Sequence, residues 1–165
     1  MDGIHIVLCS PQIPHNTGNI IRLCANTGLQ LHLIHPLGFD LNNPNLKRAA
    51  LDYSDIADVY EYSSFNEYKT IFSDRRMLAT SSSGNTIYSS IQYTPNDSIL
   101  FGSEDTGLPE KIINIFENNH LIRIPMQPAN RSINLSNAVA IVAYETWRQA
   151  NFIGDDQITS TKHFS

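Results

Sequence analysis

Small polar side chains gather in three short segments of the chain, residues 16–22, 101–109 and 126–136. The third segment follows an apolar, strand-like run at residues 121–125 and precedes a long helical pattern. In α/β proteins ligands bind at such places, because a crevice opens at the carboxyl ends of strands and helix N-termini offer unpaired N–H groups. A connecting loop with Asn134 or Ser136 as a helix N-cap would show the same composition. Three segments of one character favour a binding site over that simpler explanation.

The helix expected over residues 16–27 carries an unusual polar face. A helical period places Asn19, Arg22 and Asn26 opposite its apolar residues. A merely solvated face is more typically Lys and Glu, and Asn is a poor helix former. Two amides flanking one guanidinium therefore indicate positioned hydrogen bonding rather than solubility.

Strand-like and helix-like patterns alternate along the chain, as in the β-α-β units of a parallel sheet. The expected strands cover residues 4–9, 31–34, 58–62, 76–80, 98–101 and 121–125. The expected helices cover residues 16–27, 44–51, 109–117 and 134–150. A capping box at residues 64–67 predicts one more helix. The fold class is α/β with a parallel sheet.

Composition limits the kind of protein. The 165 residues suit one domain with its own core, expected over residues 1–154, followed by a polar, disordered tail at residues 155–165. The net charge of −5 and pI near 5.6 argue against binding nucleic acid by bulk electrostatics, so any such contact must be local. A charged fraction of 16% is low for a fully solvated monomer and favours a buried self-association surface.

Several classes of site are poorly supported. Cys9 and Cys24 form no C-x-x-C pair, and the scattered histidines indicate no metal site. The chain has no G-x-S-x-G elbow, and the glycines at 102 and 107 are not followed by the Lys of a P-loop. No apolar run approaches the ~20 residues of a membrane span, and the first residues lack the basic region of a signal peptide. The expectation is a cytoplasmic protein without a membrane segment.

The last expected helix has apolar residues on more than one side. One stripe has the spacing of a core face, and further apolar residues lie outside it: Leu135, Ala138, Val139 and Val142 in the stripe, Ala140, Ala143 and Tyr144 beyond it. For a small domain, the simplest explanation is the seam of a homodimer.

With these three segments, the chain resembles the SPOUT superfamily of S-adenosylmethionine-dependent RNA methyltransferases. The resemblance is closest to the small bacterial tRNA wobble-nucleotide 2′-O-methyltransferases and covers residues 4–154. It rests on three ordered motifs at residues 13–28, 101–109 and 124–139. It implies a single-domain α/β fold with a C-terminal deep trefoil knot, an obligate homodimer, S-adenosylmethionine as cofactor and tRNA as substrate, without a metal. A knot could not be derived from chain-handedness rules.

The resemblance also implies roles for individual residues. Cofactor contacts fall on Thr80, Gly102, Glu104, Ile124, Ser132 and Asn134. Arg22 would activate the ribose 2′-hydroxyl, and Asn16 would orient the nucleotide or Arg22. Because a guanidinium with a pKa above ~12 is a poor base, Arg22 is better suited to fixing a phosphate and polarising the hydroxyl, with an RNA phosphate taking the proton. The local RNA-binding patch would add Lys47, Arg48 and Arg131.

Two stretches depart from the family pattern. Residues 103–107 stand where the family often has Pro-Glu-Thr-Arg-Gly, and residues 128–132 where it often has Pro-Asp-Ser-Arg-Ser. The missing Arg and Asp predict weaker or rearranged RNA contacts near Thr106 and Ala129. The expected substrate is the wobble cytidine or modified uridine of leucine-type tRNA. The alternatives are the same chemistry on ribosomal RNA or another tRNA position, and a non-catalytic nucleotide-binding regulatory module.

Overall fold

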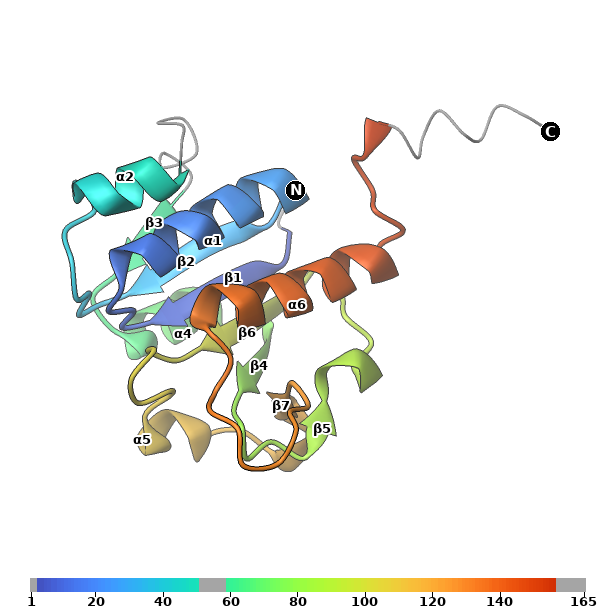
Figure 1. Cartoon of the computed structure of the whole chain (residues 1–165). Coiled ribbons are helices and arrows are strands. Elements are labelled where there is room, and N and C mark those ends of the chain that lie inside the picture. The colour runs from blue at the N-terminus through green and yellow to red at the C-terminus, as the bar shows by residue number, and fades with distance from the viewer. Residues whose placement is uncertain (1–2, 51–58, 157–165) are drawn as a thin grey trace.

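A single sheet of parallel strands lies at the centre of the molecule (Figure 1). The computed structural model describes residues 3–50 and 59–156. Its strands are β1 (His5–Cys9), β2 (Gln30–Ile34), β3 (Val59–Tyr62), β4 (Arg76–Thr80), β5 (Thr86–Ile87), β6 (Asp97–Phe101) and β7 (Leu121–Arg123). Within the described residues they lie in the order β3-β2-β1-β6-β4-β7-β5. The direction of the chain along the sheet therefore reverses beside β1, where a crevice opens in folds of this kind.

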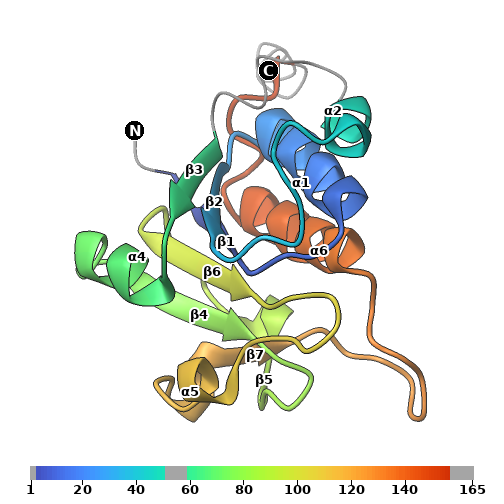
Figure 2. The ribbon, with the colours of Figure 1, turned by 90° about the vertical axis from the view of Figure 1, so that its left-hand side faces the viewer.

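Helices cover both faces of the sheet (Figure 2). They are α1 (Pro14–Thr27), α2 (Pro44–Ala50), α4 (Phe65–Ile71), α5 (Glu110–Ile113) and α6 (Leu135–Gln149), with 3₁₀ turns at Tyr88–Ser90 and Asn118–His120. The helices α1, α2 and α6 lie on one side of the sheet, and α4 and α5 lie on the other. The molecule thus has three layers.

The two helical layers explain why the central strands β1 and β6 are buried along their whole length. Neighbouring residues of a strand point to opposite faces, so Leu8 packs with α1 and α6 while Val7 packs toward α4 and α5. The first core includes Ile20 of α1 and Val139 of α6, and the second includes Tyr68 of α4. A strand buried on both faces cannot show the alternation of a half-exposed strand.

Most expected elements form within one or two residues of their predicted ends. The helix expected over 109–117 is wrong in length, because it ends at Ile113 and the chain continues through turns rich in Asn to Leu121. The two-residue strand β5 was not expected. The capping box is only half formed: the Ser64 hydroxyl accepts from the Glu67 N–H at 3.2 Å, but the Glu67 carboxylate returns to Ser63. Residues 51 and 58, at the ends of two expected elements, lie outside the described residues.

Helix α1 shows the two faces that its sequence predicts. Asn19, Arg22 and Asn26 are exposed, whereas Ile20 and Cys24 are buried in the core. The helix ends where expected, because Gly28 adopts a left-handed conformation with φ 70° and closes the last turn through its N–H to the Cys24 carbonyl.

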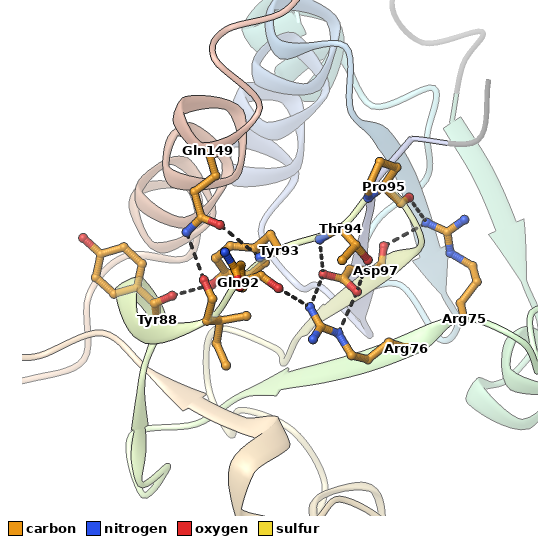
Figure 3. A network of polar contacts seen from close by, with 10 residues as sticks. Arg75, Arg76, Tyr88, Gln92, Tyr93, Thr94, Pro95, Asp97 and Gln149 are labelled. Atoms are coloured by element: carbon orange, nitrogen blue, oxygen red, sulfur yellow. Dashed lines mark hydrogen bonds and ion pairs between the residues drawn. The ribbon is translucent and has the colours of Figure 1, made fainter.

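A polar network fixes the C-terminal end of α6 to the sheet (Figure 3). The side-chain amide of Gln149 accepts a hydrogen bond from the Tyr93 N–H at 3.0 Å and donates to the Ile91 carbonyl at 2.9 Å. Arg76, at the start of β4, pairs with the fully buried Asp97 at 2.6 Å and donates to the Gln92 carbonyl. The loop before β6 is therefore held on one side by α6 and on the other by β4.

No helix within residues 3–50 and 59–156 is long and apolar enough to cross a membrane. Of the tail expected to begin at residue 155, residues 157–165 lie outside the described part of the chain.

Candidate active site

A pocket of about 440 Å³ opens at the carboxyl ends of β4, β6 and β7. Its walls come from residues 80–82, 101–108, 122–124 and the first residues of α6, with Ile13 and Asn16 at the start of α1. This volume is typical of a small-molecule site. The place is the one predicted from the three polar segments, at strand ends and beside helix N-termini.

The pocket brings together the residues to which the resemblance gives cofactor contacts, and one of the two catalytic candidates. Its lining includes Thr80, Gly102, Glu104, Ile124, Ser132, Asn134 and Asn16. The four basic residues expected at the RNA do not line it: Arg22, Lys47, Arg48 and Arg131. Arg22 lies six residues after Asn16, roughly 9 Å further along α1, and its side chain is exposed.

Glu104 anchors the start of α1 to the loop after β6. Its carboxylate accepts hydrogen bonds from the backbone N–H groups of Gln12 at 2.7 Å and Ile13 at 3.1 Å, and from Asn16 Nδ2 at 3.0 Å. Ile13, the N-cap of α1, has no side chain that could satisfy these groups. A carboxylate at the N-terminus of a helix is also favoured by the helix dipole. Glu104 therefore supplies a cap from a distant segment.

Asn16 and Asn134 extend this anchor to the start of α6. Asn134 Nδ2 donates to Asn16 Oδ1 at 3.0 Å, while Asn134 Oδ1 accepts from the Ser136 N–H at 2.9 Å and so caps α6. The simpler explanation considered for Asn134, a helix N-cap, is thus correct, and the same residue lines the pocket. One chain of hydrogen bonds, Glu104 to Asn16 to Asn134, joins the three polar segments.

The loop at residues 102–107 closes on itself. A Cβ at Gly102 would lie 2.0 Å from the carbonyl carbon of Gly107, and Gly107 itself has φ +69°. The hydroxyls of Ser103 and Thr106 are 2.9 Å apart. Ser103 and Thr106 both differ from the family pattern at residues 103–107. The two differing side chains therefore bond to each other. Gly102 is required by the loop's own backbone as well as by any close approach of a ligand.

Thr80 of the pocket and Ala129 of a nearby loop segment have distinctive local structure. The Thr80 hydroxyl donates to the Leu100 carbonyl at 2.9 Å, so its side chain holds β4 to β6. Ala129, in the loop between β7 and α6, has φ +63°, a left-handed conformation that is costly for alanine. Ala129 lies in residues 128–132, the second stretch that departs from the family pattern.

Sequence reasoning missed several lining residues. Ser81 and Ser82 directly follow β4. Because ligands bind at the carboxyl ends of parallel strands, this position could have identified them. Arg123 ends β7 and also lines the pocket, but the sequence shows it only as one scattered charge among others.

Metal and thiol chemistry receive no support from the described residues. In residues 3–50 and 59–156 no group of three or more His, Cys, Asp or Glu is placed to hold a metal ion. Burial raises the pKa of both the Cys9 and the Cys24 thiol to about 12, so neither is a ready nucleophile.

Comparison with known proteins assigns the chain to a family. The family described as SpoU rRNA Methylase matches residues 3–144. The chain belongs to the SpoU rRNA methylase family. A curated relative from Aeromonas hydrophila, named tRNA (cytidine(34)-2′-O)-methyltransferase, is 47% identical over 154 residues, which cover 93% of this chain and 99% of the relative.

Solved SpoU structures share the fold. A structure described as giving insight into the 2-OH methylation of C/U34 on tRNA superposes with a TM-score of 0.84 at 40% identity, covering 90% of this chain and 97% of that one. The SpoU methyltransferase AviRb from Streptomyces viridochromogenes, in complex with AdoMet, superposes with a TM-score of 0.80 at 21% identity, covering 91% and 58%. The expected α/β fold with a parallel sheet is therefore confirmed.

Proposed function

We propose that this chain is an S-adenosylmethionine-dependent tRNA methyltransferase that methylates the ribose 2′-hydroxyl of the wobble nucleotide. The observation that carries the proposal is the hydrogen-bonded chain from Glu104 through Asn16 to Asn134, which assembles the three motifs around one pocket. The SpoU family match and the relative named for cytidine 34 support it.

The pocket suits S-adenosylmethionine in size and chemistry. Apolar side chains, including Leu108, Ile113 and Ile124, can receive an adenine ring, and the polar residues Ser82 and Ser132 lie on the same walls. Gly102, Ile124 and Ser132 would hold the cofactor largely through main-chain groups. Thr80 would also contact it through its main chain, because its hydroxyl is already bonded to the Leu100 carbonyl. When bound, S-adenosylmethionine supplies a methyl group on a positively charged sulfur.

The protein's own tasks are alignment and removal of the hydroxyl proton, because methyl transfer from a sulfonium produces a neutral thioether. Asn16 is a positioning residue whose amide is bonded at both ends, so it fixes α1 and with it the direction of Arg22. Arg22 fixes a phosphate of the target nucleotide and polarises the 2′-hydroxyl, and an RNA phosphate takes the proton.

The RNA contact is local, since the net charge of the chain is −5. Arg48 and Arg131 are exposed, and with Lys47 and Arg22 they would bind a few phosphates of a small stem-loop. An anticodon loop suits this site because its unstacked wobble nucleotide can be splayed out, and leucine-type tRNA is the proposed substrate.

The remaining elements of the proposal concern the whole chain. A C-terminal trefoil knot is part of the proposal because the three motifs at residues 13–28, 101–109 and 124–139 resemble those of the SPOUT superfamily. A homodimer is supported by the exposed Tyr144 on α6. A tRNA-modifying enzyme of this kind would act in the cytoplasm.

The experiment is a titration with S-adenosylmethionine followed by a methyl-transfer assay on tRNA. We expect the wild-type protein to bind the cofactor and methylate tRNA, whereas Arg22→Ala binds the cofactor equally and transfers no methyl group. Lys69→Ala, an exposed cation on α4, is the matched control and keeps full activity. Near-normal turnover by Arg22→Ala would refute the role of Arg22.

Methylation of ribosomal RNA is the second candidate, because the family description names ribosomal RNA. A protein that binds the cofactor but methylates only ribosomal RNA would favour it. A protein that binds the cofactor and methylates neither RNA would favour the regulatory module.

A further inference from the structure

Arg123 is a partly buried cation with no partner. Within the described residues its guanidinium makes no hydrogen bond or ion pair, although it is not exposed. The other arginines away from the surface are well paired: Arg75 bonds Ser98 and three backbone carbonyls, and Arg76 pairs with Asp97. Partial removal of a charge from water is unfavourable without a partner, so a half-buried, unpaired guanidinium in a pocket wall is well placed to bind an anionic group.

The place of Arg123 limits what that ligand can be. It is the last residue of β7, it lines the pocket, and its neighbour Ile122 accepts a hydrogen bond from the Ser81 N–H at 2.9 Å. On its other side Arg123 pairs in register with Ile87 of β5. Arg123 therefore belongs to the end of the sheet that forms a wall of the pocket, where a small ligand enters. Arg131 is exposed instead and suits an RNA phosphate.

The acidic residues of the pocket do not neutralise Arg123. Glu104 already accepts three hydrogen bonds from Gln12, Ile13 and Asn16. Asp105 is exposed and forms no ion pair with Arg123. Neither carboxylate of the pocket lining is therefore bonded to Arg123, and its guanidinium donors stay available to a ligand.

We infer that Arg123 binds the carboxylate of the methionine portion of S-adenosylmethionine. The inference rests on the proposed function, since it presumes that the pocket takes this cofactor. A planar guanidinium and a carboxylate can form two parallel hydrogen bonds, and such charged pairs are stronger than neutral ones. The hydroxyl of Ser82, on the same wall, can add a further donor to the carboxylate. Arg123 would then select ligands that carry the amino-acid end.

Calorimetry with two ligands tests the inference without an activity assay. The ligands are S-adenosylmethionine and 5′-methylthioadenosine, which keeps the nucleoside and sulfur but lacks the amino-acid portion. For Arg123→Met we expect the affinity for S-adenosylmethionine to fall roughly tenfold or more and that for 5′-methylthioadenosine to stay unchanged. Arg123→Lys keeps the charge but loses the paired geometry, so it should lie between. Lys69→Met controls for the loss of one positive charge far from the pocket.

Each other outcome overturns a different statement. If Arg123→Met lost affinity for both ligands equally, Arg123 would support the pocket wall and would not select the carboxylate. Unchanged affinity for both ligands, with a raised KM for tRNA, would assign Arg123 to an RNA phosphate. A folded wild-type protein that binds neither ligand would refute the proposed function, and the inference with it.

Discussion

His32 shows how one buried side chain can make the stability of the fold depend on pH. Its ring stacks on that of His5 at a centroid distance of 3.9 Å, and its Nδ1 lies 2.9 Å from the Tyr62 hydroxyl. Its Nε2 is buried without a partner among the described residues. Burial, and then the nearby His5 and Arg75, lower the pKa of His32 from 6.5 to about 3. The folded protein therefore holds His32 neutral.

A neutral buried histidine predicts loss of stability in mild acid. Because the unfolded chain binds the proton near pH 6.5 and the folded chain only near pH 3, stability present above pH 6.5 is lost as the pH falls toward 3. The loss from His32 between about pH 6.5 and about pH 5 is on the order of 2 kcal/mol. Urea unfolding at both pH values should show a smaller loss in His32→Phe. Asn26→Ala, which changes an exposed side chain that does not titrate, should show the same loss of stability as the wild type.

Asn16 links both pocket loops to α1, so its loss should affect catalysis and stability together. Asn16→Ala leaves Glu104 and Asn134 each without one hydrogen bond, which should lower the free energy of unfolding by about 1–3 kcal/mol. As a positioning residue it should lower kcat more than it changes cofactor affinity. Asn66→Ala, an exposed position on α4, should change neither quantity. A wild-type kcat in Asn16→Ala would contradict the positioning role.

At the scale of elements, Gly18 sets the distance between α1 and α2. Inside a glycine-containing motif it could be taken for a ligand-binding glycine, but a Cβ there would lie 2.6 Å from both Ala49 Cβ and the Leu46 carbonyl oxygen. Gly18→Ala should therefore push the helices apart and lower the free energy of unfolding by about 1–3 kcal/mol. Asn26→Ala, exposed on the same helix, should not destabilise the protein. Equal urea midpoints for wild type and Gly18→Ala would contradict this role.

The elements were largely predictable from sequence, and their connections were not. Apolar runs and the stop at Gly28 predicted most strands and α1, because these signals are local. The link from Glu104 to Asn16 spans 88 residues of chain and that from Asn134 to Asn16 spans 118. Composition and period carry no information about such pairs, so a pocket at the strand ends was predictable while its assembly was not. Arg123 was missed because in the sequence it is one scattered charge among others.

At the scale of the whole molecule, the exposed end of α6 predicts self-association. Tyr144 is 48% exposed and packs edge-on against Trp147, whose ring meets Phe152 at a centroid distance of 5.3 Å. Aromatic side chains gathered at a surface are typical of interfaces. Sedimentation at micromolar concentration should show a dimer and no significant monomer, and Tyr144→Glu should shift the protein toward monomer. A clean 18.5 kDa species in the wild type would refute the homodimer.

In the proposed function, the pocket and Arg22 together methylate one ribose of tRNA. The most direct measurement is mass spectrometry of oligonucleotides from leucine-type tRNA incubated with the protein and S-adenosylmethionine. We expect one added methyl group on the ribose of the wobble nucleotide, and none with Arg22→Ala. A methyl group on a base, or on a ribose outside the anticodon loop, would contradict it.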